Sequence, residues 1–243
     1  MEHKHIKVRA AIFDIYGTLL EVSAPPKNAD ALWERLFEST LDTPPTVSRL
    51  EFSRRTSHII ARCHADAKAH GIRWPEIIWP RVVLEVIPAL ARLSARKRDE
   101  FILRQMQIGR ALTLASHAAD CLRQLNEDGV VLGIASNSQA YTLREVADAL
   151  SGTGVNLSIF EPDLRFWSFE NGFSKPDPHA FRILATKLEA RGISPAETLM
   201  VGDRMDNDIE PAKAFGWQTW QIARSANRAH SGTWRELREF VKL

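Results

Sequence analysis

The chain has 243 residues, of which 44% are hydrophobic and 26% are charged, and its formal net charge is +2. This balance is ordinary for a globular enzyme, and it predicts neither a nucleic-acid footprint nor attraction to an anionic membrane surface. The two cysteines, Cys63 and Cys121, form no C-x-x-C pair, which disfavours a disulfide framework and a thiolate zinc site. We expect a cytoplasmic protein that acts on a small molecule; its oligomeric state stays open.

The first element is an apolar run, VRAAIFD from Val8, that has the character of a buried parallel strand. About ninety residues pass before the next such run, far more than a usual connection between strand and helix. Their period is helical in NADALWERLFEST, VSRLEFSRRTSHIIARCHADAKAH, PEIIWPRVVLEVI and ARKRDEFILRQMQIGRAL. We therefore expect residues 24–114 to form a helical cap domain, inserted into a core domain of residues 1–23 and 115–243.

Three further apolar runs follow the insert: VVLGIASN from Val130, TLMVGD from Thr198 and WQTWQIA from Trp217. Segments of helical period separate them, and SGTWRELREFVKL predicts a closing helix with Ser231 as its N-cap. Strands and helices that alternate in this way predict an α/β fold, with a Rossmann-like parallel sheet and helices on both of its faces.

Polar side chains stand where three of these strands end. Asp14 ends the first strand, Ser136 and Asn137 end the second, and Asp203 ends the third, with Asp208 following in GDRMDNDIEPA. Ligands of open α/β sheets bind at the carboxyl ends of the strands. We therefore expect these groups to share one crevice with the lysine of GFSKPDPHAF, Lys175.

This set of side chains suits group transfer through a covalent intermediate. A carboxylate held against phosphorus or an activated carbon is a nucleophile, and the two-step route divides one barrier into two. Asp14 and Asp203 would repel each other without a cation, which suggests a hard divalent ion, Mg²⁺ by preference. The Ser136 hydroxyl and the Lys175 ammonium would hold the transferred group.

The same segments resemble the motifs of the haloacid dehalogenase-like hydrolase superfamily. FDIYGTLL is similar to its first motif with Asp14 as nucleophile, IASNS to the second with Ser136, and SKPDP to the third with Lys175. VGDRMDNDI is similar to the fourth motif, with Asp203 and Asp208.

The resemblance implies a Rossmann-like core, an aspartyl-enzyme intermediate and, in phosphatases, Mg²⁺ held by the Asp14 carboxylate, the Tyr16 backbone carbonyl and Asp203. It also implies a supporting role for Asp208. Gly17 suits a tight turn where bare backbone approaches a ligand. The expected substrate contacts are Gly17, Thr18 and Asn137.

Position 16 departs from the phosphatase pattern. Phosphatases of the superfamily carry a second aspartate there as general acid and base, whereas 2-haloacid dehalogenases have D-x-Y-G-T, as this chain does with Tyr16. Those dehalogenases work without metal and usually have a serine- and asparagine-rich fourth motif in place of GDxxxND, whereas this chain keeps both aspartates. They also need a cap arginine for the substrate, for which the candidates are Arg49, Arg54, Arg55 and Arg62.

The two motifs therefore favour different reactions. The retained aspartates favour Mg²⁺-dependent hydrolysis of a small phosphate monoester, in which water or the Tyr16 hydroxyl stands in for the missing acid. Two alternatives stay open: a metal-free 2-haloacid dehalogenase, and a ligand-binding or regulatory protein that is impaired in turnover.

Overall fold

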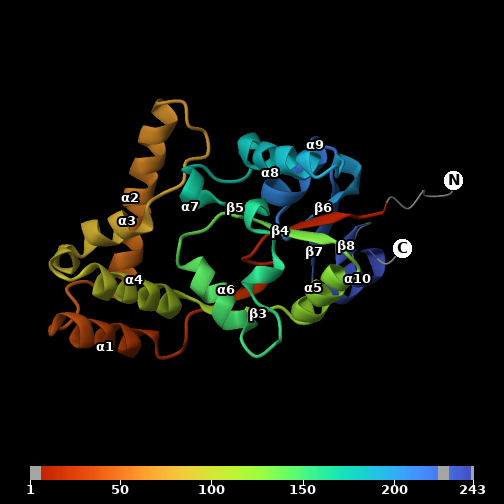
Figure 1. The fold of residues 1–243 in the computed structure, drawn as a ribbon. Coiled ribbons are helices and arrows are strands. Elements are labelled where there is room, and N and C mark those ends of the chain that lie inside the picture. Colours follow the sequence, from red (N-terminus) through yellow and green to blue (C-terminus); the bar gives the residue numbers. More distant parts are fainter. Residues whose placement is uncertain (1–6, 224–229, 242–243) are drawn as a thin grey trace. The chain divides into compact units, whose positions relative to one another are not determined.

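The computed structural model describes residues 7–223 and 230–241. The chain divides into two compact units (Figure 1): a core unit, Met1–Glu21 with Thr113–Leu243, and a helical unit, Val22–Leu112. The sequence predicts this division at residues 24 and 114. Each unit has its own core.

The core unit is built on a six-stranded sheet in the order β5-β4-β1-β6-β7-β8, and every neighbouring pair is parallel. Its strands are β1 (Ala10–Phe13), β4 (Val131–Ser136), β5 (Arg165–Trp167), β6 (Thr198–Gly202), β7 (Gln218–Ile222) and β8 (Ser231–Gly232). The four predicted strands are confirmed as β1, β4, β6 and β7. The sequence analysis did not predict β5 and β8, which have three and two residues and therefore show no period.

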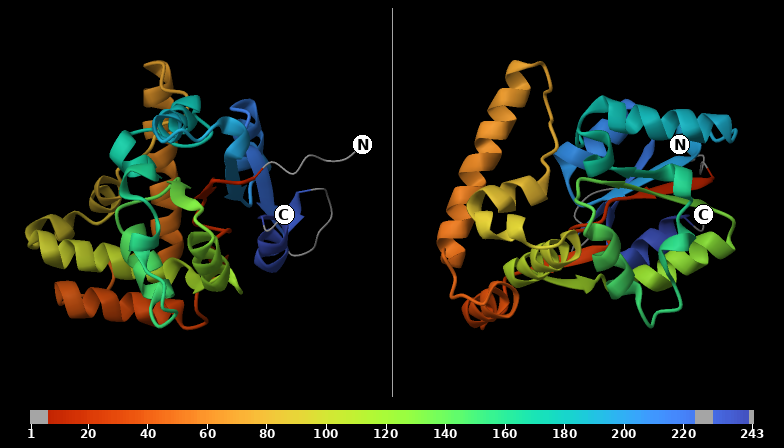
Figure 2. Two further views of the ribbon diagram at one scale, coloured as in Figure 1. Left: turned by 45° about the vertical axis from the view of Figure 1, so that its right-hand side comes forward. Right: turned by 60° about the vertical axis from the view of Figure 1, so that its left-hand side comes forward.

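Helices cover both faces of this sheet, with α8 and α9 on one face and α5 and α10 on the other (Figures 1 and 2). The helices of the unit are α5 (Ala118–Glu127), α6 (Thr142–Leu150), α7 (Ser168–Asn171), α8 (Pro178–Ala190), α9 (Glu210–Ala214) and α10 (Trp234–Val241). Short 3-10 turns lie at Leu157–Ile159, Pro162–Leu164 and Pro195–Glu197. The predicted α/β fold with a Rossmann-like parallel sheet is confirmed.

Successive side chains of β1 pack on opposite faces, because side chains alternate along a strand. Ile12 belongs to the core cluster that includes Phe181 of α8. Its neighbour Phe13 stacks on Trp234 of α10, with ring centroids 5.6 Å apart. Both sides of the central strand are thus buried, which explains its unbroken apolar run.

The N-cap predicted for the closing helix is wrong by two positions. Ser231 lies in β8, whereas Thr233 precedes α10 and forms a capping box with Glu236. The Glu236 carboxylate accepts from the Thr233 N–H at 2.7 Å, and the Glu236 N–H donates to the Thr233 hydroxyl at 3.4 Å.

The helical unit contains α1 (Ala29–Leu41), α2 (Arg49–Ala69), α3 (Trp79–Val86), a 3-10 turn (Pro88–Arg92) and α4 (Ala95–Gly109). The four predicted helical segments are confirmed. Trp33, Phe37 and Phe101 form its aromatic core, with ring centroids 5.2 to 6.4 Å apart. Ser48 and Ser94 cap α2 and α4 through side-chain hydrogen bonds.

The chain crosses from one unit to the other twice. Both crossings lie in a two-stranded sheet formed by β2 (Leu20–Ser23) and β3 (Ala111–Leu114). None of the helices within the described part of the chain has the length and apolar character needed to cross a bilayer.

Candidate active site

The site begins where the central strand ends. The Asp14 N–H donates to the Val201 carbonyl at 2.9 Å, which continues the pairing of β1 with β6 one residue past the strand. On the other side β1 pairs with β4, whose last residue is Ser136. Since all three strands are parallel, Asp14, Ser136 and Asp203 lie at the same edge of the sheet, as predicted.

The loop after Asp14 is held in a tight turn. Gly17 has φ 82°, a left-handed conformation, and a Cβ at this position would collide with the Asp203 carboxylate. Glycine is therefore required both for the turn and for the close approach of Asp203. One residue on, the Thr18 carbonyl accepts a buried hydrogen bond from Trp234 Nε1 at 3.1 Å, so α10 anchors the turn.

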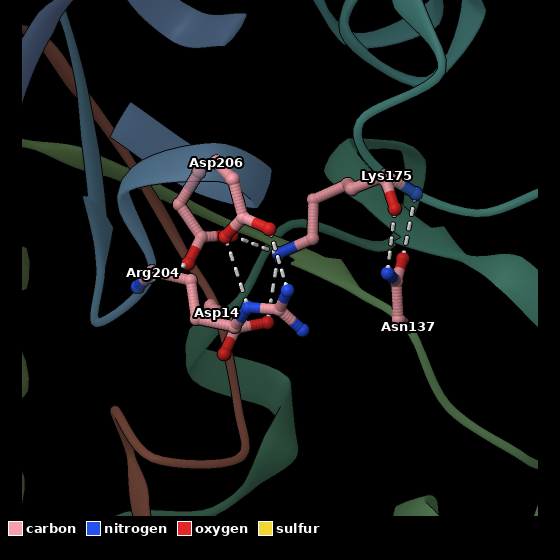
Figure 3. A network of polar contacts seen from close by, with 6 residues as sticks. Asp14, Asn137, Lys175, Arg204 and Asp206 are labelled. Atoms are coloured by element: carbon pink, nitrogen blue, oxygen red, sulfur yellow. Dashed lines mark hydrogen bonds and ion pairs between the residues drawn. The ribbon is translucent and has the colours of Figure 1, made fainter. Parts of the chain in front are cut away.

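Lys175 lies between two carboxylates (Figure 3). Its Nζ is 2.7 Å from Asp14 Oδ1 and 2.5 Å from Asp208 Oδ1, and the residue is 3% exposed. Burial works to lower the pKa of the lysine, but Asp14 and Asp208 outweigh it, so the pKa is raised and the side chain is charged. The structure thus brings together the groups that the sequence placed in the first, third and fourth motifs.

Asn137 holds this lysine in place. Its Oδ1 accepts from the Lys175 N–H at 2.7 Å, and its Nδ2 donates to the Lys175 carbonyl at 2.8 Å (Figure 3). The sequence analysis predicted a substrate contact for Asn137. In the structure both ends of its side-chain amide bind the backbone of Lys175, and the substrate contact stays a prediction.

Asp14, Asp203 and Asp208 form an acidic cluster in which one carboxylate oxygen from each residue lies within 4.8 Å of the others. Asp208 is 1% exposed and sits in a single π-helical turn, Met205–Ile209, a feature common at functional sites. If all three carboxylates are ionised, the Lys175 ammonium leaves the cluster with a charge of about −2. A divalent cation would balance that charge.

The pKa values of Asp14 and Asp203 are consistent with this excess of negative charge. Burial raises the pKa of Asp14 to about 6; Lys175 opposes this effect, whereas Asp208 and Asp203 add to it. Burial and Asp208 also raise the pKa of Asp203. Among the residues that the structure describes, no group hydrogen-bonds the buried Asp203 Oδ1. Hard carboxylate oxygens, one of them buried without a partner, fit Mg²⁺.

Two buried hydroxyls point to a ligand as well. Thr18 and Ser136 are both fully buried, and their hydroxyl oxygens have no hydrogen-bond partner within residues 7–223 and 230–241. An unsatisfied buried hydroxyl costs about 1–3 kcal/mol, so each of these two needs a partner such as water or a bound ligand.

The Tyr16 side chain forms hydrogen bonds within the core unit. Its hydroxyl donates to the Glu145 carboxylate and lies 2.6 Å from Thr142 Oγ1. Both partners come from α6, and they are 5% and 0% exposed. The sequence analysis missed both residues. The available signal was a glutamate on the apolar face of TLREVADAL, next to the buried Val146, since buried glutamates usually have a specific partner.

The neighbouring Asp206 lies outside the acidic cluster. It is exposed and pairs with Arg204 at 2.7 Å (Figure 3), and this hydrogen bond lowers its pKa. The four candidate arginines of the helical unit form ion pairs within that unit: Arg49 with Asp30, Arg54 and Arg55 with Glu51, and Arg62 with Glu85.

Comparison with known proteins places the chain in a family. Residues 8–216 match the family model of the haloacid dehalogenase-like hydrolases. The chain is 26% identical over 222 residues to (S)-2-haloacid dehalogenase 4A of Burkholderia cepacia, which covers 90% of this chain and 85% of that protein. It is 35% identical over 103 residues to a glyceraldehyde 3-phosphate phosphatase of Methanopyrus kandleri, which covers 42% and 40%.

Solved structures share the fold of this chain. A 2-haloacid dehalogenase from Pseudomonas syringae superposes with a TM-score of 0.64 at 18% identity, over 97% of this chain and 98% of that one. Both curated relatives are hydrolases by name, but they act on different substrates. The chain, with its aspartate at the end of the central strand, belongs to the haloacid dehalogenase-like hydrolases.

Proposed function

We propose that the protein hydrolyses a small phosphate monoester in a Mg²⁺-dependent reaction with Asp14 as nucleophile. The observation that supports this most is the acidic cluster of Asp14, Asp203 and Asp208, with Asp14 and Asp208 buried and Asp203 partly buried, which a single ammonium does not neutralise. Carboxylates without a counter-ion in a buried site are costly, and a metal-free reaction would have no use for Asp203.

Each side chain then has a task. Lys175 holds Asp14 Oδ1, so the other carboxylate oxygen attacks phosphorus; the new O–P bond forms as the bond to the leaving oxygen breaks. Water then attacks the phosphorus and releases phosphate, which restores the Asp14 carboxylate. The Thr18 and Ser136 hydroxyls donate to the oxygens of the transferred group.

The cation completes the charge balance. When bound by the carboxylates of Asp14 and Asp203 and the Tyr16 backbone carbonyl, Mg²⁺ neutralises negative charge on the phosphoryl group. Asp208 supports the site through Lys175, whose ammonium it contacts. We further propose that the helical unit acts as the cap that sets specificity and that the protein is cytoplasmic, in keeping with its two free cysteines.

The test is phosphate release from a broad panel of monoesters, with Mg²⁺ or with EDTA, using Asp14→Asn as the blank. We expect Mg²⁺-dependent release that the blank lacks. Asp203→Asn should abolish the Mg²⁺ dependence and lower the rate, whereas Asp206→Asn is the matched control from the same loop and should retain activity. Release that EDTA leaves unchanged, or equal loss in the two variants, contradicts the metal role.

A second candidate is 2-haloacid dehalogenase. Tyr16 in place of the second aspartate favours it, because a halide leaves without a proton, and so does the relative from Burkholderia cepacia. Halide release from 2-chloropropionate in EDTA, lost in Asp14→Asn but retained in Asp203→Asn, would establish it. Mg²⁺ binding without turnover of either substrate class would instead favour a regulatory protein.

A further inference from the structure

The hydrogen bonds of Tyr16 determine what its hydroxyl can do. A phenol carries a single hydrogen, and Tyr16 donates it to Glu145. The Thr142 hydroxyl, 2.6 Å away, is therefore the donor in the second bond. Both roles of the Tyr16 hydroxyl, as donor and as acceptor, are filled by buried residues of α6.

To protonate a leaving group, Tyr16 would have to break its bond to a carboxylate that is 5% exposed. A buried polar group is costly to deprive of a hydrogen-bond partner. The phenol is thus held by Glu145 and Thr142 and does not replace the missing aspartate as an acid.

The other acidic groups at the site also have tasks. Asp14 is the proposed nucleophile, Asp203 is a proposed metal ligand, and Asp208 contacts Lys175. The lysine in turn binds both Asp14 and Asp208. These four side chains cannot serve as a proton donor without leaving a role that the reaction needs.

We propose that the site uses phosphate compounds whose leaving group departs as an anion, namely phosphates of phenols, enols and carboxylic acids, and that Glu145 and Thr142 are positioning residues that enforce this choice through Tyr16. This inference rests on the proposed phosphatase function. In the first step the P–O bond breaks with both electrons on the leaving oxygen, which takes its proton from solvent afterwards. In the second step the proton of the attacking water also goes to solvent.

The dependence of rate on the leaving group tests this. We would measure kcat/KM of the full chain with Mg²⁺ for a series of aryl phosphates, for acetyl phosphate and for an alkyl phosphate. General acids contribute about 10²–10⁴ to rate, and poor leaving groups lose that help here. We expect acetyl and 4-nitrophenyl phosphate to exceed the alkyl phosphate by at least about 100-fold, with a steep fall as the leaving-group pKa rises.

Variants separate positioning from proton transfer. Tyr16→Phe should lower the rate for all substrates by the same factor, which leaves the slope against leaving-group pKa unchanged. Tyr16→Asp should flatten the slope, because a carboxylic acid returns to the position. Glu145→Ala should lower kcat with an unchanged slope, and Glu145→Gln, which keeps an acceptor, should rescue it.

Each possible outcome is decisive. A flat slope in the unmodified protein overturns the inference while the phosphatase function stands. A steeper slope in Tyr16→Phe also overturns it, since the hydroxyl would then be the acid. No phosphate release from acetyl, aryl or alkyl phosphates refutes the phosphatase function and the inference together.

Discussion

Removing the charge of Lys175 should destabilise the core unit by an amount that depends on pH. The ammonium is 3% exposed and lies 2.7 Å from Asp14 and 2.5 Å from Asp208. Lys175→Met keeps most of the aliphatic stem but leaves two buried carboxylates without their cation. Removing one partner of a buried ion pair typically costs about 3–5 kcal/mol, because the remaining charge is not compensated.

Calorimetry in EDTA measures this loss. For a unit of this size each 1 kcal/mol shifts Tm by about 2–4 °C, so the transition of the core unit should fall by roughly 6–20 °C at pH 7. The loss should shrink as the pH falls through 6. The pKa of Asp14 is already about 6 with the lysine present, and without it this pKa rises further, so acid neutralises the uncompensated charge.

A surface lysine provides the control. Lys213 pairs with Glu210 at 3.0 Å with half of its side chain exposed, so Lys213→Met should change stability by less than about 0.5 kcal/mol. The reasoning is refuted if Lys175→Met matches this control at pH 7, or if its deficit grows on acidification.

Three further changes test the loop and its charge. In EDTA, the stability of the wild type relative to Asp14→Asn should increase by up to about 3 kcal/mol as the pH falls from 7 to 4. The reason is that a carboxyl with a raised pKa of about 6 favours the folded state when it is protonated. A difference in thermal unfolding that stays constant with pH contradicts this. Gly17→Ala places an alanine in a left-handed conformation, which costs about 1–2 kcal/mol, and pushes its Cβ against the Asp203 carboxylate. Mg²⁺-dependent activity should therefore fall. If activity and urea stability are both unchanged, glycine is not required at this position. Trp234→Phe removes the hydrogen bond to the Thr18 carbonyl and should cost about 1–3 kcal/mol in urea unfolding; no loss would mean that the bond contributes nothing.

The sequence predicted most of the core fold because the parallel strands are continuous apolar runs. β1, β4 and β6 are buried along almost their whole length, and each ends at polar residues of the candidate site, whereas β7 is only partly buried. This pattern is enough to bring Asp14, Lys175 and Asp208 together. β5 and β8 have too few residues for a period, and only their partners in the sheet define them.

The contacts of Tyr16 could not be predicted in the same way. Glu145 is 129 residues from Tyr16, and its position on α6 is consistent with a solvated helix until the tertiary packing is known. The hydrogen bonds of the Asn137 amide to the Lys175 backbone were not predicted either, because the motif gives the position of Asn137 at the strand end but not the direction of its amide. Sequence patterns predict which elements form, whereas hydrogen bonds between distant elements depend on their packing.

The anchoring of the loop after Asp14 by Trp234 has a consequence for biosynthesis. Thr18 and Trp234 are 216 residues apart, and β1 pairs with β6 over a separation almost as long. At about 5–20 residues per second, roughly 10–45 s pass between the synthesis of Thr18 and that of Trp234. β4 is synthesised earlier and can pair with one edge of β1, but until β6 follows, the other edge of this apolar strand has no partner, so the nascent chain is prone to aggregation. The loop after Asp14 can therefore reach its anchored conformation only after α10 has left the ribosome.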